Sequence, residues 1–351
     1  MKIAVAMSGG IDSTVAAVLL KEQGHEITGI TARFLPGNDL NDEIYNRSLA
    51  DARSVADHFG FRLIEIPLMN IFKEKVIKPF SKEYLTGRTP NPCVACNRYV
   101  KFPELLDAAR DSGCEKLATG HYVLKKFNGV RYYLSMSPDP AKDQSYFLYM
   151  LSQEQLADII FPIGEFTKER IREIAAEKNI ITRDKPDSQE ICFIPDNDYI
   201  SFLESCSGEL PGPGDIIDSS GKVLGKHNGI YRYTIGQRRG MGISAPHPLY
   251  VTGLDEKSNR VIAGPRDELL ISRLETTGCY DMKQVIDNEI TAFAKCRSTQ
   301  RPVPCRVKRN NEKFIVTFDS PETGISPGQS AVFYDEGHDV LGGGVIDRAW
   351  R

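Results

Sequence analysis

The stretch KIAVAMSGGIDSTVAAVLL, residues 2–20, joins an apolar run to a turn of two glycines set between serines and an aspartate. Residues 2–7 predict a short strand. Residues 12–23 have the apolar spacing of a helix that ends near Gly24. The SGGIDS turn therefore lies at the carboxyl end of the strand.

The same alternation of strand and helix signals repeats through the first third of the chain. We predict strands at 27–32, 62–67 and 116–119, and helices at 49–59 and 102–110. This alternation predicts an α/β fold with a doubly wound parallel sheet, whose ligands bind beyond the carboxyl ends of the strands.

SGGIDS has the chemistry of a phosphate cradle. Gly9 and Gly10 let the backbone approach a phosphate, the free amides of the new helix point at it, and the hydroxyls of Ser8 and Ser13 add donors. The turn is not a Walker A loop, because no lysine follows the second glycine at the required place. A plain strand-to-helix turn, capped by Ser8 and Asp12, is the alternative.

This loop resembles the S-G-G-x-D-S loop of the ATP pyrophosphatase (PP-loop) superfamily. Five further stretches resemble the tRNA-specific 2-thiouridylase family in the same order: GRTPNPCVACNRYVKF (87–102), LATGHY (117–122), KDQSYFL (142–148), KPDSQEICFI (185–194) and YTIGQRRG (233–240). The resemblance runs from residue 1 to about 344. It implies an enzyme that uses ATP to adenylate the C2 oxygen of the wobble uridine, position 34, and replaces that oxygen with sulfur.

The resemblance also implies the nucleotide site. The residues expected around ATP are Ala6, Met7, Ser8, Gly9, Gly10, Ile11, Asp12, Ser13, Ala32 and Gly120. Ala32 departs from the family pattern, in which methionine is common. Asp12 is expected to help place Mg²⁺, which neutralises phosphate charge.

Two cysteines fit the sulfur chemistry. By resemblance, Cys192 carries a persulfide, and Cys96 resolves the resulting link by forming a disulfide with Cys192. Five other cysteines are expected to be small buried hydrophobes: Cys114, Cys206, Cys279, Cys296 and Cys305.

Cys93 is a second departure, since many family members have aspartate there. With Cys96 and Cys192 it can supply three ligands of a 4Fe-4S cluster, which is the mechanism that the sequence favours slightly. The persulfide route with two cysteines stays open beside it, as do a redox pair and a zinc site for the C-x-x-C spacing.

The resemblance implies a tRNA surface from several segments. Asn91, Pro92 and Cys93 are expected at the target base, with tRNA contacts from His121, Lys142, Asp143, Gln144, Arg297, Ser298 and Gln329. A core histidine is an equally good interpretation of His121.

Beyond residue 201 the sequence is rich in turns and short strands. We predict a PP-loop domain at 1–200, a central β-rich tRNA-contacting domain at 201–268, which can include the helical segment 161–182, and a C-terminal β-barrel that binds tRNA at 269–351. The run 219–254 has no acidic residue and contains Arg238, Arg239, Tyr231 and Tyr233, a composition that suits a phosphate-tracking surface.

Composition sets the outer bounds. A chain of 351 residues with 41% apolar and 26% charged residues and a net charge of −3 predicts a cytoplasmic, monomeric globular protein without a membrane segment. The expected partners are tRNA and a sulfur donor: a cysteine desulfurase, a sulfur-relay protein or sulfide. Two other functions stay open: a PP-loop synthetase acting on a small molecule, such as an argininosuccinate or NAD synthetase, and a nonenzymatic RNA-binding adaptor.

Overall fold

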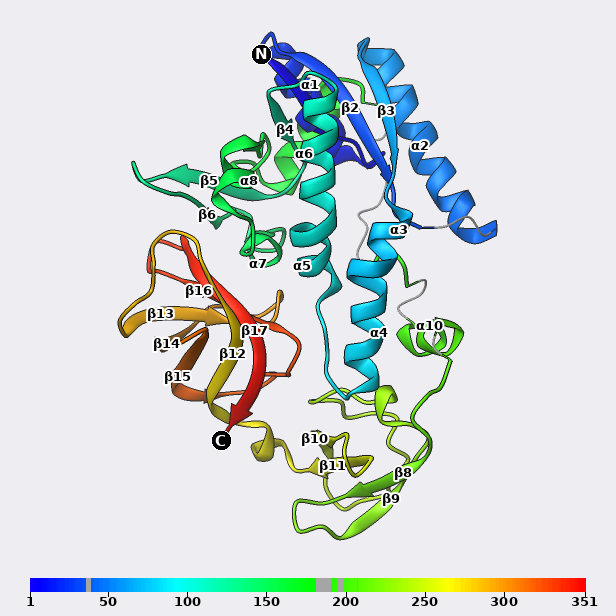
Figure 1. The fold of residues 1–351 in the computed structure, drawn as a ribbon, viewed down its shortest axis with the longest axis vertical. Coiled ribbons are helices and arrows are strands. Elements are labelled where there is room, and N and C mark those ends of the chain that lie inside the picture. The colour runs from blue at the N-terminus through cyan, green and yellow to red at the C-terminus, as the bar shows by residue number, and fades with distance from the viewer. Residues whose placement is uncertain (36–38, 181–190, 195–197, 207) are drawn as a thin grey trace.

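The computed structural model describes residues 1–35, 39–180, 191–194, 198–206 and 208–351. Figure 1 shows three parts: an α/β domain that contains the N-terminus, a small sheet at the opposite end, and a barrel that contains the C-terminus. This arrangement confirms the predicted fold class.

The first part is built on a parallel sheet in the order β3-β2-β1-β4-β7. Its strands are β1 (Lys2–Ala6), β2 (Glu26–Arg33), β3 (Arg62–Pro67), β4 (Lys116–Ala118) and β7 (Ile159–Ile160). The pairings along the sheet are all parallel.

Helices cover both faces of this sheet. Alternate residues of β1 face opposite cores: Ile3 and Val5 pack with α1 (Ile11–Glu22) and α2 (Asp39–Phe59), whereas Ala4 packs with α6 (Phe102–Asp111). This alternation is the two-residue period of a strand, and it makes the sheet doubly wound. Helix α2 begins ten residues before its predicted start, because its first half is mostly polar and gives a weak apolar signal.

Several elements between the predicted ones carry the functional segments. They are α3 (Met69–Phe72), the π-helix η1 (Lys73–Ile77), α4 (Lys78–Leu85), α5 (Pro92–Cys96), the π-helix η2 (Asn97–Lys101), the hairpin β5 (Val123–Phe127) and β6 (Tyr132–Met136), α7 (Ser145–Leu148), α8 (Gln153–Asp158), α9 (Lys168–Glu177) and α10 (Tyr199–Cys206). Helix α9 lies in the segment 161–182, which the sequence allows as part of either the first or the central domain. In the structure this helix packs on α1 of the first domain.

Two β-rich parts follow. The central sheet has the order β10-β11-β8-β9, from β8 (Gly214–Ile217), β9 (Val223–His227), β10 (Tyr250–Asp255) and β11 (Arg260–Gly264). The last part is a closed barrel in the order β12-β15-β14-β13-β16-β17, from β12 (Ile271–Asp281), β13 (Ile290–Lys295), β14 (Val303–Asn310), β15 (Lys313–Glu322), β16 (Ser330–Tyr334) and β17 (Val340–Trp350).

A buried ion pair joins the α/β domain to the barrel. Lys295 Nζ lies 3.6 Å from Asp143 Oδ2, and their side chains are 4% and 0% exposed. Asp143 also accepts hydrogen bonds from Ser145 and from the Ser137 amide. Desolvation lowers the pKa of Lys295, and Asp143 opposes that shift. The Asp143 carboxylate therefore faces inward in this conformation, and the predicted contact of Asp143 with tRNA stays a prediction.

No helix formed by the described residues has both the length and the apolar character that a membrane crossing needs.

We predict that Lys295→Ala destabilises the protein by roughly 3–5 kcal/mol, because it leaves the Asp143 carboxylate buried without a counter-charge. Lys313→Ala removes an ion pair with Glu275 at a side chain that is 41% exposed, and should cost roughly 0–1 kcal/mol. Thermal unfolding of the two full-length variants measures the difference. Equal losses would contradict the assignment of the pair as a buried domain link.

Candidate active site

The SGGIDS turn forms a compact loop between β1 and α1. The Ser13 hydroxyl accepts from the Ser8 amide at 3.2 Å, lies 3.2 Å from the Ser8 hydroxyl, and donates to the Gly10 carbonyl. Gly10 is the N-cap of α1, and no described side chain caps this helix. The first amides of α1 are therefore available to an anion, as the cradle prediction requires.

Gly9 is required by its conformation and by its surroundings. Its φ is +71°, and a Cβ at this position would lie 2.3 Å from the Ser48 carbonyl oxygen in α2. The loop thus depends on two glycine properties at once: the left-handed backbone and the close approach to a neighbouring helix.

Asp12 makes the most specific contacts of the loop. Lys168 Nζ lies 2.8 and 2.9 Å from its two carboxylate oxygens, and the Tyr122 hydroxyl donates to Oδ1 at 2.6 Å. Lys168 is the first residue of α9 and is only 6% exposed. No lysine directly follows the glycines in the sequence, but the fold brings Lys168 to the loop from a distant helix. The one local signal in the sequence is Thr167, a residue type that favours the N-cap position, and it indicates that a helix begins at Lys168.

The remaining residues predicted for ATP form the loop, flank it or lie near the end of the neighbouring strand β2. The Met7 and Ile11 side chains are buried in the cores. Gly120 lies against the start of α1, where a Cβ would meet the Asp12 and Ser13 backbone at 2.7 Å. Ala32, near the end of β2, is half-buried beside the apolar clusters of the sheet.

The first two cysteines lie on the short helix α5. Asn91 is its N-cap, and its side-chain oxygen accepts from the Val94 amide at 3.3 Å; Pro92 occupies the first turn. Cys93 is exposed, whereas Cys96, almost one turn later, is buried. The expected contact of Asn91 and Pro92 with a target base stays a prediction.

Cys192 is held near them by its neighbour. The Phe193 ring lies 5.6 Å from Phe72, 5.2 Å from Phe80 and 5.1 Å from Phe202 between ring centroids. Phe193 and Cys96 belong to the same apolar cluster. The Cys192 side of this short segment stays exposed.

Electrostatic coupling also groups the three thiols. Desolvation raises the pKa of Cys192 to about 12, with smaller contributions from Cys96 and Cys93, although the residue is partly open to solvent. The pKa values of Cys93 and Cys96 are raised for the same main reason. Lys101, at the end of η2, opposes this increase in pKa at all three thiols. Its effect on the thiols was not predicted from the sequence.

The three cysteines are free thiols, and they are not arranged to bind an iron–sulfur cluster. Among the residues with described positions, no group of three or more histidine, cysteine, aspartate or glutamate side chains is arranged to hold a metal ion. As they lie, Cys93, Cys96 and Cys192 therefore do not fit the predicted 4Fe-4S cluster.

The other residues predicted for tRNA are scattered between interior and surface. His121 is half-buried: its Nδ1 lies 2.8 Å from the Thr119 hydroxyl, and desolvation, with Lys101, lowers its pKa to about 3. The Gln144 side chain accepts from the Tyr122 amide, and Lys142 is half-exposed beside it. In the barrel, Arg297 is exposed, Ser298 is half-buried, and the Gln329 amide donates to the Thr89 carbonyl at 2.8 Å.

The basic run 219–254 is only partly available. Arg238 and Arg239 are exposed, and Arg238 lines a hollow of about 460 Å³ together with Met241, His247 and Leu249. Tyr231 and Tyr233, in contrast, are buried in apolar clusters, so the two arginines, and not these two rings, are open to solvent.

The cysteines outside the site follow the sequence expectation with two exceptions. Cys114, Cys296 and Cys305 are buried. Cys279 is only half-buried, and Cys206 is exposed at the end of α10.

Comparison with known proteins places this fold and loop in a class of nucleotide-using enzymes. Residues 1–196 match the family described as tRNA methyl transferase HUP domain, residues 200–265 its PRC-barrel domain, and residues 266–346 the aminomethyltransferase beta-barrel domain. The fold and the glycine loop define an ATP-binding enzyme of the PP-loop class.

Full-length relatives define the family more closely. The chain is 46% identical to the tRNA-specific 2-thiouridylase MnmA of Syntrophotalea carbinolica, over 98% of each chain. It is 45% identical to the protein of that name from Geobacter metallireducens, over 99% of this chain and 97% of the relative. The chain belongs to the tRNA-specific 2-thiouridylase family and is a tRNA sulfurtransferase; methyl transfer appears only in the name of the domain family.

We predict that Gly9→Ala lowers the ATP-dependent rate about 100-fold, because the added Cβ displaces the loop that must hold the phosphates. Gly24→Ala is the matched control: its φ is +84°, but no atom lies within 4 Å of the added Cβ. The control should lose about 1 kcal/mol of stability and keep its rate. Measured rates of AMP formation would contradict the loop assignment if the two variants behaved alike.

Proposed function

We propose that this chain thiolates C2 of uridine 34 in tRNA, by ATP-dependent adenylation of the C2 oxygen followed by attack of a cysteine persulfide. The observation that supports this most is the pairing, within one chain, of two features: an uncapped glycine loop at the carboxyl edge of a parallel sheet, and an apolar cluster that contains both Cys96 and Phe193, the neighbour of Cys192. A small-molecule synthetase has no use for the second feature, and a binding adaptor has no use for the first.

The loop would serve the first half-reaction. Amides at the start of α1 and the hydroxyls of Ser8 and Ser13 would hold the ATP phosphates while the uridine oxygen attacks the α-phosphorus and pyrophosphate leaves. Lys168 supplies the positive charge that the loop lacks. Both Asp12 oxygens are already engaged by Lys168, so Asp12 serves to orient that lysine.

No protein ligand for Mg²⁺ is assigned. Asp12 is committed to Lys168 and Tyr122, and the described residues offer no ready metal group. A divalent ion that arrives with the nucleotide would be held by the phosphates themselves.

The cysteines would perform the second half-reaction. The terminal sulfur of a persulfide on Cys192 attacks the adenylated C2, and AMP leaves. The Cys96 thiolate then attacks Cys192 Sγ, the sulfur–sulfur bond to the tRNA breaks, and a Cys96–Cys192 disulfide forms as thiolated tRNA departs. An external thiol must reduce that disulfide before the next turnover.

The proposed reaction uses no iron–sulfur cluster, because the three cysteines do not fit one as they lie. Cys93 is then an exposed neighbour of the reacting pair. Lys101 favours the thiolate form at all three sulfurs and would help deprotonate Cys96.

The RNA would reach the site across the two β-rich parts. Arg238 and Arg239 on the central domain, and Arg297 on the barrel, are exposed cations that can follow a phosphate backbone. The sulfur donor can be a desulfurase or a relay protein, because each delivers persulfide sulfur to the Cys192 thiol without a separate oxidant.

The test of this function is the tRNA dependence of AMP formation. With ATP and a tRNA transcript containing uridine 34, the protein should release AMP and pyrophosphate; with transcript carrying cytidine 34, it should not. AMP formation without RNA would support a small-molecule synthetase. Absence of ATP turnover under all conditions would support an adaptor.

We predict that Cys96→Ser and Cys192→Ser each abolish formation of 2-thiouridine while leaving adenylation intact, since neither thiol serves the phosphates. Cys93→Asp should keep substantial activity in protein free of iron. Cys206→Ser is the control, since Cys206 is also exposed but is not one of the three proposed site cysteines, Cys93, Cys96 and Cys192. Mass spectrometry of digested tRNA measures the product; loss of activity in Cys93→Ala together with lost iron would contradict the two-cysteine route.

A further inference from the structure

Five residues between α4 and α5, 87–91, lie between the two β-rich parts. Gly87 packs against Leu254 of the central sheet, where a Cβ would meet the Leu254 side chain at 3.1 Å. The next residues face the barrel, and the last is the N-cap of the cysteine helix α5. We call residues 87–91 the strap.

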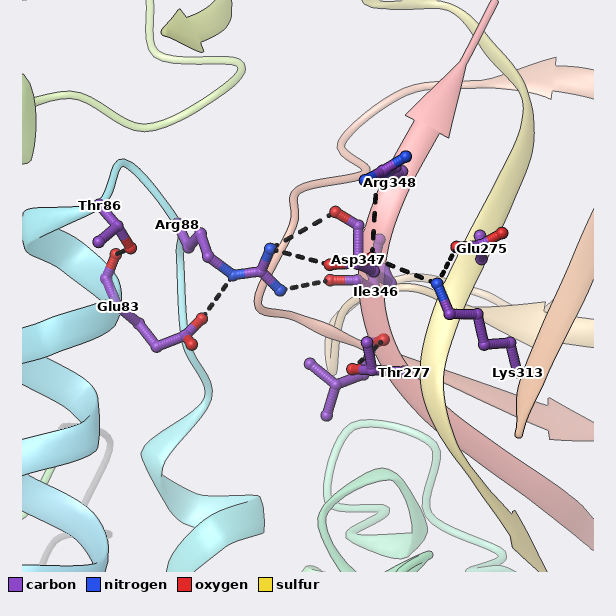
Figure 2. Close-up of polar contacts among 10 residues, drawn as sticks. Glu83, Thr86, Arg88, Glu275, Thr277, Lys313, Ile346, Asp347 and Arg348 are labelled. Atoms are coloured by element: carbon purple, nitrogen blue, oxygen red, sulfur yellow. Dashed lines mark hydrogen bonds and ion pairs between the residues drawn. The ribbon is translucent and has the colours of Figure 1, made fainter. Parts of the chain in front are cut away.

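Arg88 makes the most extensive contact between the strap and the barrel. Its Nε donates to Glu83 Oε2 at 2.6 Å, its Nη1 reaches Asp347 Oδ1 at 3.3 Å, and its Nη2 donates to the Ile346 carbonyl at 3.1 Å. Figure 2 shows the guanidinium between α4 on one side and β17 on the other. The Arg88 and Asp347 side chains are only 25% and 23% exposed, which limits screening by water.

The residues after Arg88 are held by backbone contacts. The Thr89 amide donates to the Pro327 carbonyl at 2.8 Å, and Gln329 Nε2 donates to the Thr89 carbonyl at 2.8 Å. Gly328 is so close that a Cβ there would lie 2.9 Å from the Thr89 backbone. The barrel therefore fixes the strap immediately before Asn91, and so fixes where α5 begins.

The geometry points to Arg88 as a positioning residue for sulfur transfer: by joining Glu83 to Asp347 and Ile346, it sets the placement of Cys93 and Cys96 on α5. This inference rests on the proposed sulfur chemistry for its effect on rate. The placement of Cys96 itself can be measured without any activity.

The chain offers a matched control. Arg131 also joins the α/β domain to the barrel, through Nε to the Met282 carbonyl at 2.8 Å and Nη2 to the Asp281 carbonyl at 2.7 Å. Arg131 begins the β6 side of the hairpin and lies far along the chain from α5. A general loss of barrel docking would affect both variants, whereas positioning of α5 would affect only one.

The experiment compares Arg88→Ala, Arg88→Lys, Asp347→Asn and Arg131→Ala in the full-length protein. The first readout is the alkylation rate of Cys96 by iodoacetamide, resolved from Cys93 by tandem mass spectrometry. Cys96 is buried, so its rate should rise about tenfold in Arg88→Ala and stay near wild type in Arg131→Ala. Lysine cannot make the three-way contact, so Arg88→Lys should not restore protection.

The second readout is single-turnover thiolation at saturating ATP and tRNA. The first-order rate should fall about tenfold or more in Arg88→Ala, whereas the KM for ATP, measured separately by varying ATP, should be unchanged, because misplaced sulfur affects the chemical step and not nucleotide binding. Asp347→Asn should show a smaller change in the same direction, and it carries the test if Arg88→Ala does not fold.

The outcomes separate the two claims. Wild-type protection of Cys96 in both Arg88→Ala and Asp347→Asn, or equal deprotection in Arg131→Ala, overturns the positioning role whatever the activity. Faster Cys96 alkylation confined to the Arg88 and Asp347 variants supports it even if wild-type protein proves unable to thiolate tRNA, which would instead refute the proposed function.

Discussion

The packing of Phe193 among Phe72, Phe80 and Phe202 is the interaction on which the proposed chemistry depends. Cys96 and Cys192 are far apart in sequence, and a relay of sulfur between them needs both at one place. Phe193 is 4% exposed and sits in an aromatic cluster built from α3, α4 and α10. Burial of one large ring thus keeps the adjacent cysteine near α5 while its thiol side remains open.

The glycine loop and the cysteines have different electrostatic environments. At the loop, positive charge is provided by helix amides and by Lys168, which suits a phosphate. At the cysteines, desolvation raises the pKa values and so favours the protonated thiols. Thiols are oxidised less readily than thiolates. Lys101 partly opposes this rise in pKa at all three thiols and so favours their thiolate forms.

The sheet and the loop could be predicted from the sequence because their signals are local. Apolar runs, the glycine pair and the helical spacing after Asp12 all fall within a few residues of one another. Lys168 and the strap contacts could not be predicted in this way, because each joins segments that are distant in the chain. For a related reason, the sequence does not show that the Asp143 carboxylate and the Tyr231 and Tyr233 rings face inward: a polar or aromatic residue in a motif gives no indication of which side it faces.

The most direct measurement is the position and amount of 2-thiouridine in tRNA treated with the purified protein, ATP and a sulfur donor. Digestion followed by liquid chromatography and mass spectrometry should find sulfur at uridine 34 alone, in a one-to-one ratio with AMP under single-turnover conditions. Sulfur at another nucleotide, or AMP released without thiolated product, would contradict the account.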